Sequence, residues 1–160
     1  MKKKLTVKDL KNFKGNKKLV SILAKNVEEA KAAHKVGFEL LATGSPGLYR
    51  NPDNHPNFEE IIKIRDACPY AFMHWGVADT LYSGLNGATK IAFKALEHGI
   101  DMFYCHNNTD LIKGLYKQGI PGLGHVGLVP SRRTWTGGFK AVGKNSTEAM
   151  LIYEECLMIQ

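Results

Sequence analysis

The chain has 160 residues, enough for one hydrophobic core, and its 44% hydrophobic and 9% aromatic residues are ordinary for a globular domain. Its formal charge of +7 lies at the N-terminus, because residues 1–18 hold eight lysines and one acid, Asp9, and the remainder balances to zero. Beyond a lysine-rich arm we therefore expect no basic face for a nucleic acid, and no nucleic-acid partner.

Segments with helix and strand signals alternate along the chain. After a short helix capped by Thr6, we predict apolar strands at residues 19–24, 38–43, 70–75 and 102–105, and a fifth that follows residues 119–121. Helices are predicted between and after them, each with a polar residue at its start. They are a helix over 27–36 capped by Asn26, one from Asn57 with Glu60 as a capping box to Cys68, one over about 86–98, one capped by Thr109, and a last one capped by Asn145 with Glu148.

Short apolar strands without polar alternation are typical of a parallel sheet covered on both faces. A doubly wound sheet usually carries a glycine-rich turn after its first strand, and residues 24–26 contain no glycine. We therefore predict an α/β protein of the (β/α)8 TIM-barrel type, with about five of the eight strand–helix units present. Residues 1–17 are expected to form an arm with a short helix, and residues 18–160 the N-terminal portion of the barrel. The missing units would be supplied by a continuation of the chain or by a partner chain, or they would not be supplied at all. These alternatives stay open.

Catalytic and binding residues of such barrels lie at the C-terminal ends of the strands. The polar candidates at these positions are Ser45, His74, Asp79, Tyr104, His106 and His125. Three of them are histidines on one predicted rim, so a metal site is one interpretation, and satisfied or solvent-facing histidines are the other. The remaining histidines, His34, His55 and His98, are interpreted as surface residues.

Residues 122–144 form a glycine-studded strand and loop. We predict a buried strand whose backbone is approached closely by a ligand or another strand. The loop cations Arg132, Arg133, Lys140 and Lys144 either close over an anionic substrate or are solvated charges, and Trp135 and Phe139 are either lid anchors or packing. The turn at residues 44–47, Gly-Ser-Pro-Gly, is either an anion-binding nest around Ser45 or an ordinary turn.

Three motifs carry a resemblance to a known family. Residues 124–128, Gly-His-Val-Gly-Leu, residues 137–140, Gly-Gly-Phe-Lys, and the turn at 44–47 resemble ketopantoate hydroxymethyltransferase. The resemblance implies a barrel of the phosphoenolpyruvate/pyruvate type and a step of pantothenate biosynthesis. In that step a hydroxymethyl group moves from methylenetetrahydrofolate to α-ketoisovalerate, a small 2-oxo acid, while magnesium polarises the keto acid and a base forms its enolate. It also implies a homo-oligomer.

The family's functional residues carry over only in part. Ser45 and His125 match substrate-site residues, Tyr104 stands where a substrate-binding lysine is expected, and Lys140 completes the predicted substrate contacts. Gly44 and Gly76 stand where the family has metal-binding aspartates, and His106 stands where it has a glutamate. Magnesium prefers oxygen ligands, so another metal held by His106 and His74 is a further possibility. The family's general base would lie beyond Gln160, and no catalytic base is assigned here.

Other functions remain open at this stage. The alternatives are a different carbon–carbon lyase or phosphomutase of the same superfamily, a non-catalytic ligand-binding or assembly domain, and an RNA-binding protein that uses the lysine-rich arm. Cys68, Cys105 and Cys156 form no Cys-x-x-Cys pair, which favours a reducing cytoplasm over a disulfide framework. No membrane partner is expected, because no apolar run reaches the length of a bilayer.

Overall fold

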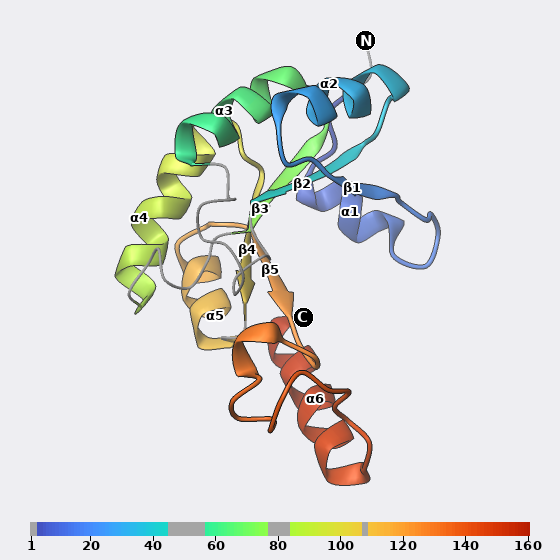
Figure 1. The fold of residues 1–160 in the computed structure, drawn as a ribbon, viewed down its shortest axis with the longest axis vertical. Helices are drawn as coiled ribbons and strands as arrows, with labels where there is room; N and C mark the ends of the chain where they lie inside the picture. The colour runs from blue at the N-terminus through green and yellow to red at the C-terminus, as the bar shows by residue number, and fades with distance from the viewer. Residues whose placement is uncertain (1–2, 45–56, 77–83, 107–108) are drawn as a thin grey trace.

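The computed structural model of the chain describes residues 3–44, 57–76, 84–106 and 109–160 (Figure 1). Its centre is one parallel sheet in which each strand pairs with the next strand of the sequence, in the order β1-β2-β3-β4-β5. The strands are β1 (Ser21–Leu23), β2 (Leu40–Gly44), β3 (Phe72–Gly76), β4 (Met102–His106) and β5 (Gly122–His125). A doubly wound sheet would reverse its strand order, so this sequential order confirms the predicted barrel-type α/β architecture.

The helices begin and end close to the predicted positions. They are α1 (Val7–Phe13), α2 (Val27–Val36), α3 (Phe58–Ala67), α4 (Gly84–Glu97), α5 (Thr109–Lys117), a 3-10 turn (Pro130–Arg132) and α6 (Ser146–Ile159). Their local signals explain this agreement, since a side-chain oxygen at the cap accepts from a free amide of the first turn. The caps are Thr6 and Asn57, each in a capping box, and Asn26 and Asn145.

The helices cover one side of the sheet. In Figure 1, α2, α3, α4 and α5 follow one another around that side, whereas α1 lies on the other side near β1 and β2. The buried core lies between the sheet and these helices, where Leu41, Met73 and Phe103 of the strands meet Ile61 of α3 and Leu115 of α5. We call the opposite face of the sheet, which carries Ala42, His74, Tyr104 and His125, the inner face.

The strand β5 is less buried than predicted, and helices approach its backbone closely. All of its residues are half-buried rather than buried, because β5 lies at the edge of the sheet and pairs only with β4 in the described part of the chain. The close approach to its backbone that the described residues show comes from side chains of two helices. A Cβ on Gly124 would stand 2.6 Å from Ile159 Cδ1 of α6 and 2.9 Å from Ile112 Cδ1 of α5. Gly124 therefore allows α6 to pack onto the sheet.

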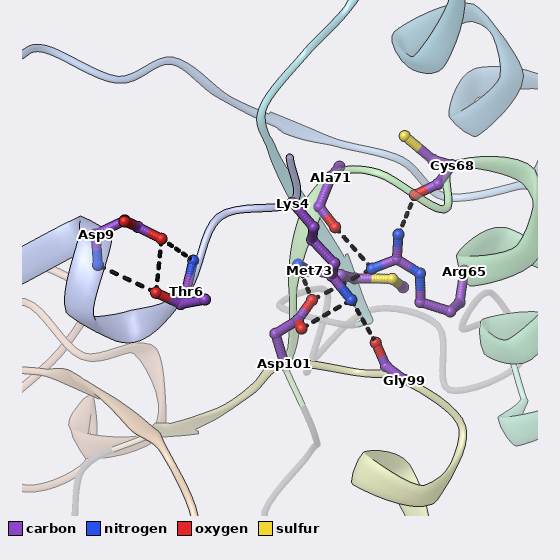
Figure 2. Close-up of polar contacts among 9 residues, drawn as sticks. All are labelled: Lys4, Thr6, Asp9, Arg65, Cys68, Ala71, Met73, Gly99 and Asp101. Carbon is purple, nitrogen blue, oxygen red and sulfur yellow. Dashed lines mark hydrogen bonds and ion pairs between the residues drawn. The ribbon is translucent and has the colours of Figure 1, made fainter. Parts of the chain in front are cut away.

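The N-terminal ends of the strands are joined by a cluster of charges, shown in Figure 2. Asp101, just before β4, accepts hydrogen bonds from the backbone amide of Met73 at 2.8 Å and from the buried guanidinium of Arg65 at 3.3 Å. Its other carboxylate oxygen lies 2.8 Å from the ammonium of Lys4. Arg65 also donates to the carbonyls of Ala71 and Cys68. The cluster links the N-terminal segment, α3, β3 and β4 at the end of the sheet away from the strand tips.

Among the described residues, no helix combines the length and the apolar character that a membrane crossing requires. The three cysteines are free thiols, two of them buried, as expected for a chain without a disulfide framework.

Candidate functional site

Three polar residues of the inner face form a diagonal row across neighbouring strands. Residues directly opposite in the sheet are His74 and Met102, and Tyr104 and Leu123. Tyr104 lies two residues beyond Met102 on β4, and His125 lies two residues beyond Leu123 on β5. Because side chains alternate between the faces of a strand, an offset of two residues keeps His74, Tyr104 and His125 on the same face. The row advances toward the C-terminal ends of the strands with each step.

The rings in this row contact one another. The hydroxyl oxygen of Tyr104 lies 2.7 Å from Nδ1 of His125, a hydrogen bond in a partly buried setting. The two rings are stacked, with centroids 6.0 Å apart and planes inclined by 25°. The ring of His74 meets that of Tyr104 edge to face, with centroids 6.1 Å apart. His74, Tyr104 and His125, three of the six predicted rim residues, therefore form a contiguous set of side chains.

Burial favours the neutral forms of two of these groups. Loss of solvent lowers the pKa of His74 and raises the pKa of Tyr104, because both charged forms are less well solvated inside the protein. The Nδ1 atom of His74 is buried and finds no hydrogen-bond partner among the described residues. The row is thus a set of aromatic hydrogen-bonding groups in which burial favours the neutral forms of His74 and Tyr104, and its chemistry suits the orientation of a polar ligand.

The ends of β2 and β3 offer no side chain to a metal ion. Gly44 and Gly76 are opposite each other in the sheet. Gly44 has a φ of +86°, and a Cβ built on it would overlap the carbonyl oxygen of Gly76 and stand 2.6 Å from Cδ1 of Trp75. A carboxylate therefore has no room at this position. No group of three His, Cys, Asp or Glu residues able to hold a metal is found in the described ranges. This donor set does not fit magnesium.

The other predicted site residues are placed as follows. Ser45, His55 and Asp79 lie outside the described residues, and so does the anion-nest interpretation of the turn. His106 ends β4 opposite His125, but its side chain is not described. His34 and His98 are exposed, as predicted. Lys140 is exposed on the loop after β5, with its ammonium 3.5 Å from the position of a Cβ on Gly137.

The loop after β5 is anchored by contacts that the sequence did not reveal. The guanidinium of Arg132 pairs with the carboxylate of Glu155 on α6. The hydroxyl of Thr136 donates to the carbonyl of Gly138 at 2.8 Å. Trp135 and Phe139 are 91% and 67% exposed, so neither ring packs into the core of the described residues. An ion pair across 23 residues has no local sequence signal, which is why Glu155 was not singled out.

Comparison with known proteins points to one family. A sequence profile of the family described as ketopantoate hydroxymethyltransferase matches residues 69–160. The 3-methyl-2-oxobutanoate hydroxymethyltransferase of Staphylothermus marinus is 28% identical over 96% of this chain and 61% of its own length. An enzyme of the same name from Thermus thermophilus is 29% identical over 97% of this chain and 64% of its own length. The chain thus spans about three fifths of the length of these curated relatives.

Among solved structures, 2,3-dimethylmalate lyase, a member of the PEP mutase/isocitrate lyase superfamily, resembles this fold. The TM-score is 0.50 with 14% sequence identity, and the match covers 66% of this chain and 47% of that one. At this identity the likeness concerns the fold alone, and it agrees with the sequential parallel sheet.

Proposed function

This chain belongs to the ketopantoate hydroxymethyltransferase family, and from that premise we propose that its inner face binds a small 2-oxo acid in a hydroxymethyl transfer. The single observation that carries the proposal is the hydrogen bond between Tyr104 and His125, within the segment that the family profile matches. Both residues lie toward the C-terminal ends of parallel strands, where barrels of this kind bind their substrates. We propose α-ketoisovalerate as the substrate and methylenetetrahydrofolate as the one-carbon donor.

The proposed chemistry requires stabilisation of negative charge on an oxygen. Removal of the C3 proton of α-ketoisovalerate by a base gives an enolate. Water cleaves the two C–N bonds of the methylene group, so that tetrahydrofolate leaves and formaldehyde is released. The enolate carbon then bonds to the formaldehyde carbon, and the formaldehyde oxygen takes up a proton to become the hydroxyl group. Hydrogen-bond donors held in place before the reaction stabilise such an oxyanion without reorganisation. Tyr104 and His125 supply polar ring atoms at this place, and we propose that Ser45 and Lys140 add contacts to the carboxylate. No base is assigned to the chain.

The ends of β2 and β3 do not fit a magnesium ion, and this affects only the part of the proposal that concerns the metal. Magnesium would polarise the keto group, but Gly44 and Gly76 leave the two strand ends without the oxygen ligands that it prefers. No step is therefore assigned to it here. Coordination of a different metal by His106 and His74 stays a prediction. We further propose a cytoplasmic homo-oligomer, on the family resemblance and on the three free thiols.

The proposal is tested on the full chain with α-ketoisovalerate. Calorimetric titration should give saturable binding, and isovalerate, which lacks the 2-oxo group, should bind much more weakly. The titration is repeated with magnesium and with EDTA, and His125→Ala should weaken binding in each condition. Lack of saturable binding of α-ketoisovalerate, with and without metal and folate, would remove the substrate assignment.

A second function, ligand binding without turnover, is favoured by the carboxylate-free ends of β2 and β3. The two functions differ in proton chemistry at C3. We would incubate the protein with α-ketoisovalerate in D2O and follow the C3 proton signal by NMR. Loss of that signal supports enolate formation, whereas stable binding without exchange supports a binding domain.

A further inference from the structure

We infer that Tyr104 is a positioning residue that holds the imidazole of His125 as the tautomer protonated on Nε2. The inference rests on the proposed function for the identity of the ligand, and on the 2.7 Å contact between the Tyr104 hydroxyl and His125 Nδ1 for the tautomer. In this arrangement the phenol donates to Nδ1, and His125 presents an N–H donor from Nε2. The ligand group that it suits is an electron-rich oxygen, such as the keto or carboxylate oxygen of a 2-oxo acid.

The two tautomers of histidine have opposite consequences for an anionic ligand. A neutral imidazole carries one proton, so one ring nitrogen donates and the other accepts. If Nδ1 accepts from the phenol, Nε2 must carry the proton and attracts an oxygen with negative charge. If Nδ1 instead donates to the phenol oxygen, Nε2 is a bare acceptor and repels that oxygen. The direction of one hydrogen bond therefore decides whether His125 favours or opposes an anion.

The proton of the phenol supports the first direction, and the ring contacts hold the two groups in place. A phenol has a pKa of about 10 and keeps its proton at neutral pH, so it always has a proton to donate. The rings of Tyr104 and His125 are stacked with planes only 25° apart, and this contact restricts rotation of the imidazole in addition to the hydrogen bond. The ring of His74 meets the ring of Tyr104 edge to face, which restricts the phenol in turn.

The pair of Tyr104 and His125 differs from the residues that the family resemblance predicts. Tyr104 stands where the resemblance predicts a substrate-binding lysine, which would contact an anion with its own charge. A phenol cannot supply a positive charge. By orienting His125, Tyr104 instead supplies an N–H donor through its neighbour, in a row where burial favours the neutral form of His74.

The test combines two readings, the tautomer of His125, which is measured without substrate, and the affinity for α-ketoisovalerate. Nitrogen-15 NMR of the full chain separates the protonated and bare ring nitrogens of His125, and we expect the Nε2–H form in the native protein. Tyr104→Phe keeps the ring contacts but removes the hydroxyl, so we expect a mixture of tautomers. Since one hydrogen bond is involved, affinity for α-ketoisovalerate should fall by about 3- to 10-fold. Tyr116→Phe, on the exposed surface of α5, is the matched control and should change neither reading.

The outcomes separate this inference from the proposed function. Native His125 in the Nδ1–H form, or an unchanged tautomer in Tyr104→Phe, overturns the inference even if the 2-oxo acid binds. The expected tautomers without binding of α-ketoisovalerate support the positioning role and overturn the substrate class. Thermal unfolding of Tyr104→Phe checks its fold. If that variant does not fold, the tautomer measured in the native protein still decides the direction of the bond.

Discussion

The carbonyl oxygen of Gly76 occupies the space that a Cβ atom on Gly44 would need. The ends of β2 and β3 are therefore held together more closely than any side chain at Gly44 would permit. The family resemblance predicts an aspartate at this position. The backbone of Gly76 leaves no room for an aspartate side chain, so the absence of this carboxylate goes together with the close packing of the two strands.

We therefore expect that Gly44→Asp does not restore magnesium binding and destabilises the fold. The variant combines backbone strain at a φ of +86° with overlap against backbone atoms, so its free energy of unfolding should fall by more than about 3 kcal/mol. Gly119→Asp isolates the strain alone, because Gly119 has a φ of +76° and no atom within 4 Å of its Cβ position. That control should lose about 1 kcal/mol. Urea unfolding of both variants measures the difference, and equal losses would contradict the close approach.

A second expectation concerns the packing of α6 on β5. Gly124→Ala places a methyl group 2.6 Å from Ile159 and 2.9 Å from Ile112, so we expect a loss of about 1–3 kcal/mol through overpacking. Gly122→Ala, on the same strand and the same face, meets Ile112 only at an ordinary 3.4 Å and should be nearly neutral. Thermal or urea unfolding compares the two variants. A neutral effect of Gly124→Ala would mean that α6 does not rest on the sheet as described.

The buried guanidinium of Arg65 gives a third prediction. Asp101→Asn keeps the size of the side chain but removes the charge opposite Arg65, and Arg65 has only 5% of its side chain exposed. Breaking a buried pair leaves an uncompensated charge, so we expect a loss of about 2–4 kcal/mol, moderated by the carbonyls that Arg65 also contacts. Glu39→Gln breaks the exposed pair with Lys17 and should cost less than about 1 kcal/mol. Comparable losses in urea unfolding would show that burial of Arg65 is unimportant.

Burial of His74 predicts a dependence of stability on pH. The pKa of His74 is lowered in the folded chain, so the unfolded chain binds a proton more readily than the folded chain does. The contribution of neutral, buried His74 to the free energy of unfolding is complete above the ordinary histidine pKa of about 6.5. It is lost as the pH falls toward the lowered pKa of His74 in the folded chain. His74→Gln should flatten the unfolding free energy between about pH 7 and 5. His34→Gln, at an exposed position, should leave the slope unchanged. An identical slope in native protein and His74→Gln would refute the assignment.

Local signals in the sequence were sufficient to place most elements. Asn26, Asn57 and Asn145 each cap the helix predicted to follow them, because a cap depends only on a side chain and the amides of the next three residues. The alternation of strands and helices, with no glycine-rich turn after the first strand, was enough to favour a barrel-type sheet over a doubly wound one.

The contacts between distant residues were decided only by the tertiary structure. The bond from Tyr104 to His125 depends on the register between β4 and β5, and a shift of one residue would place the two side chains on opposite faces. The contact of Gly124 with Ile159 of α6, more than twenty residues later, has no local sequence signal. The sequence by itself therefore determined the elements and their order, because caps and periodicity act within a few residues. Register and packing join residues far apart in the chain, and so the structure alone decided the site.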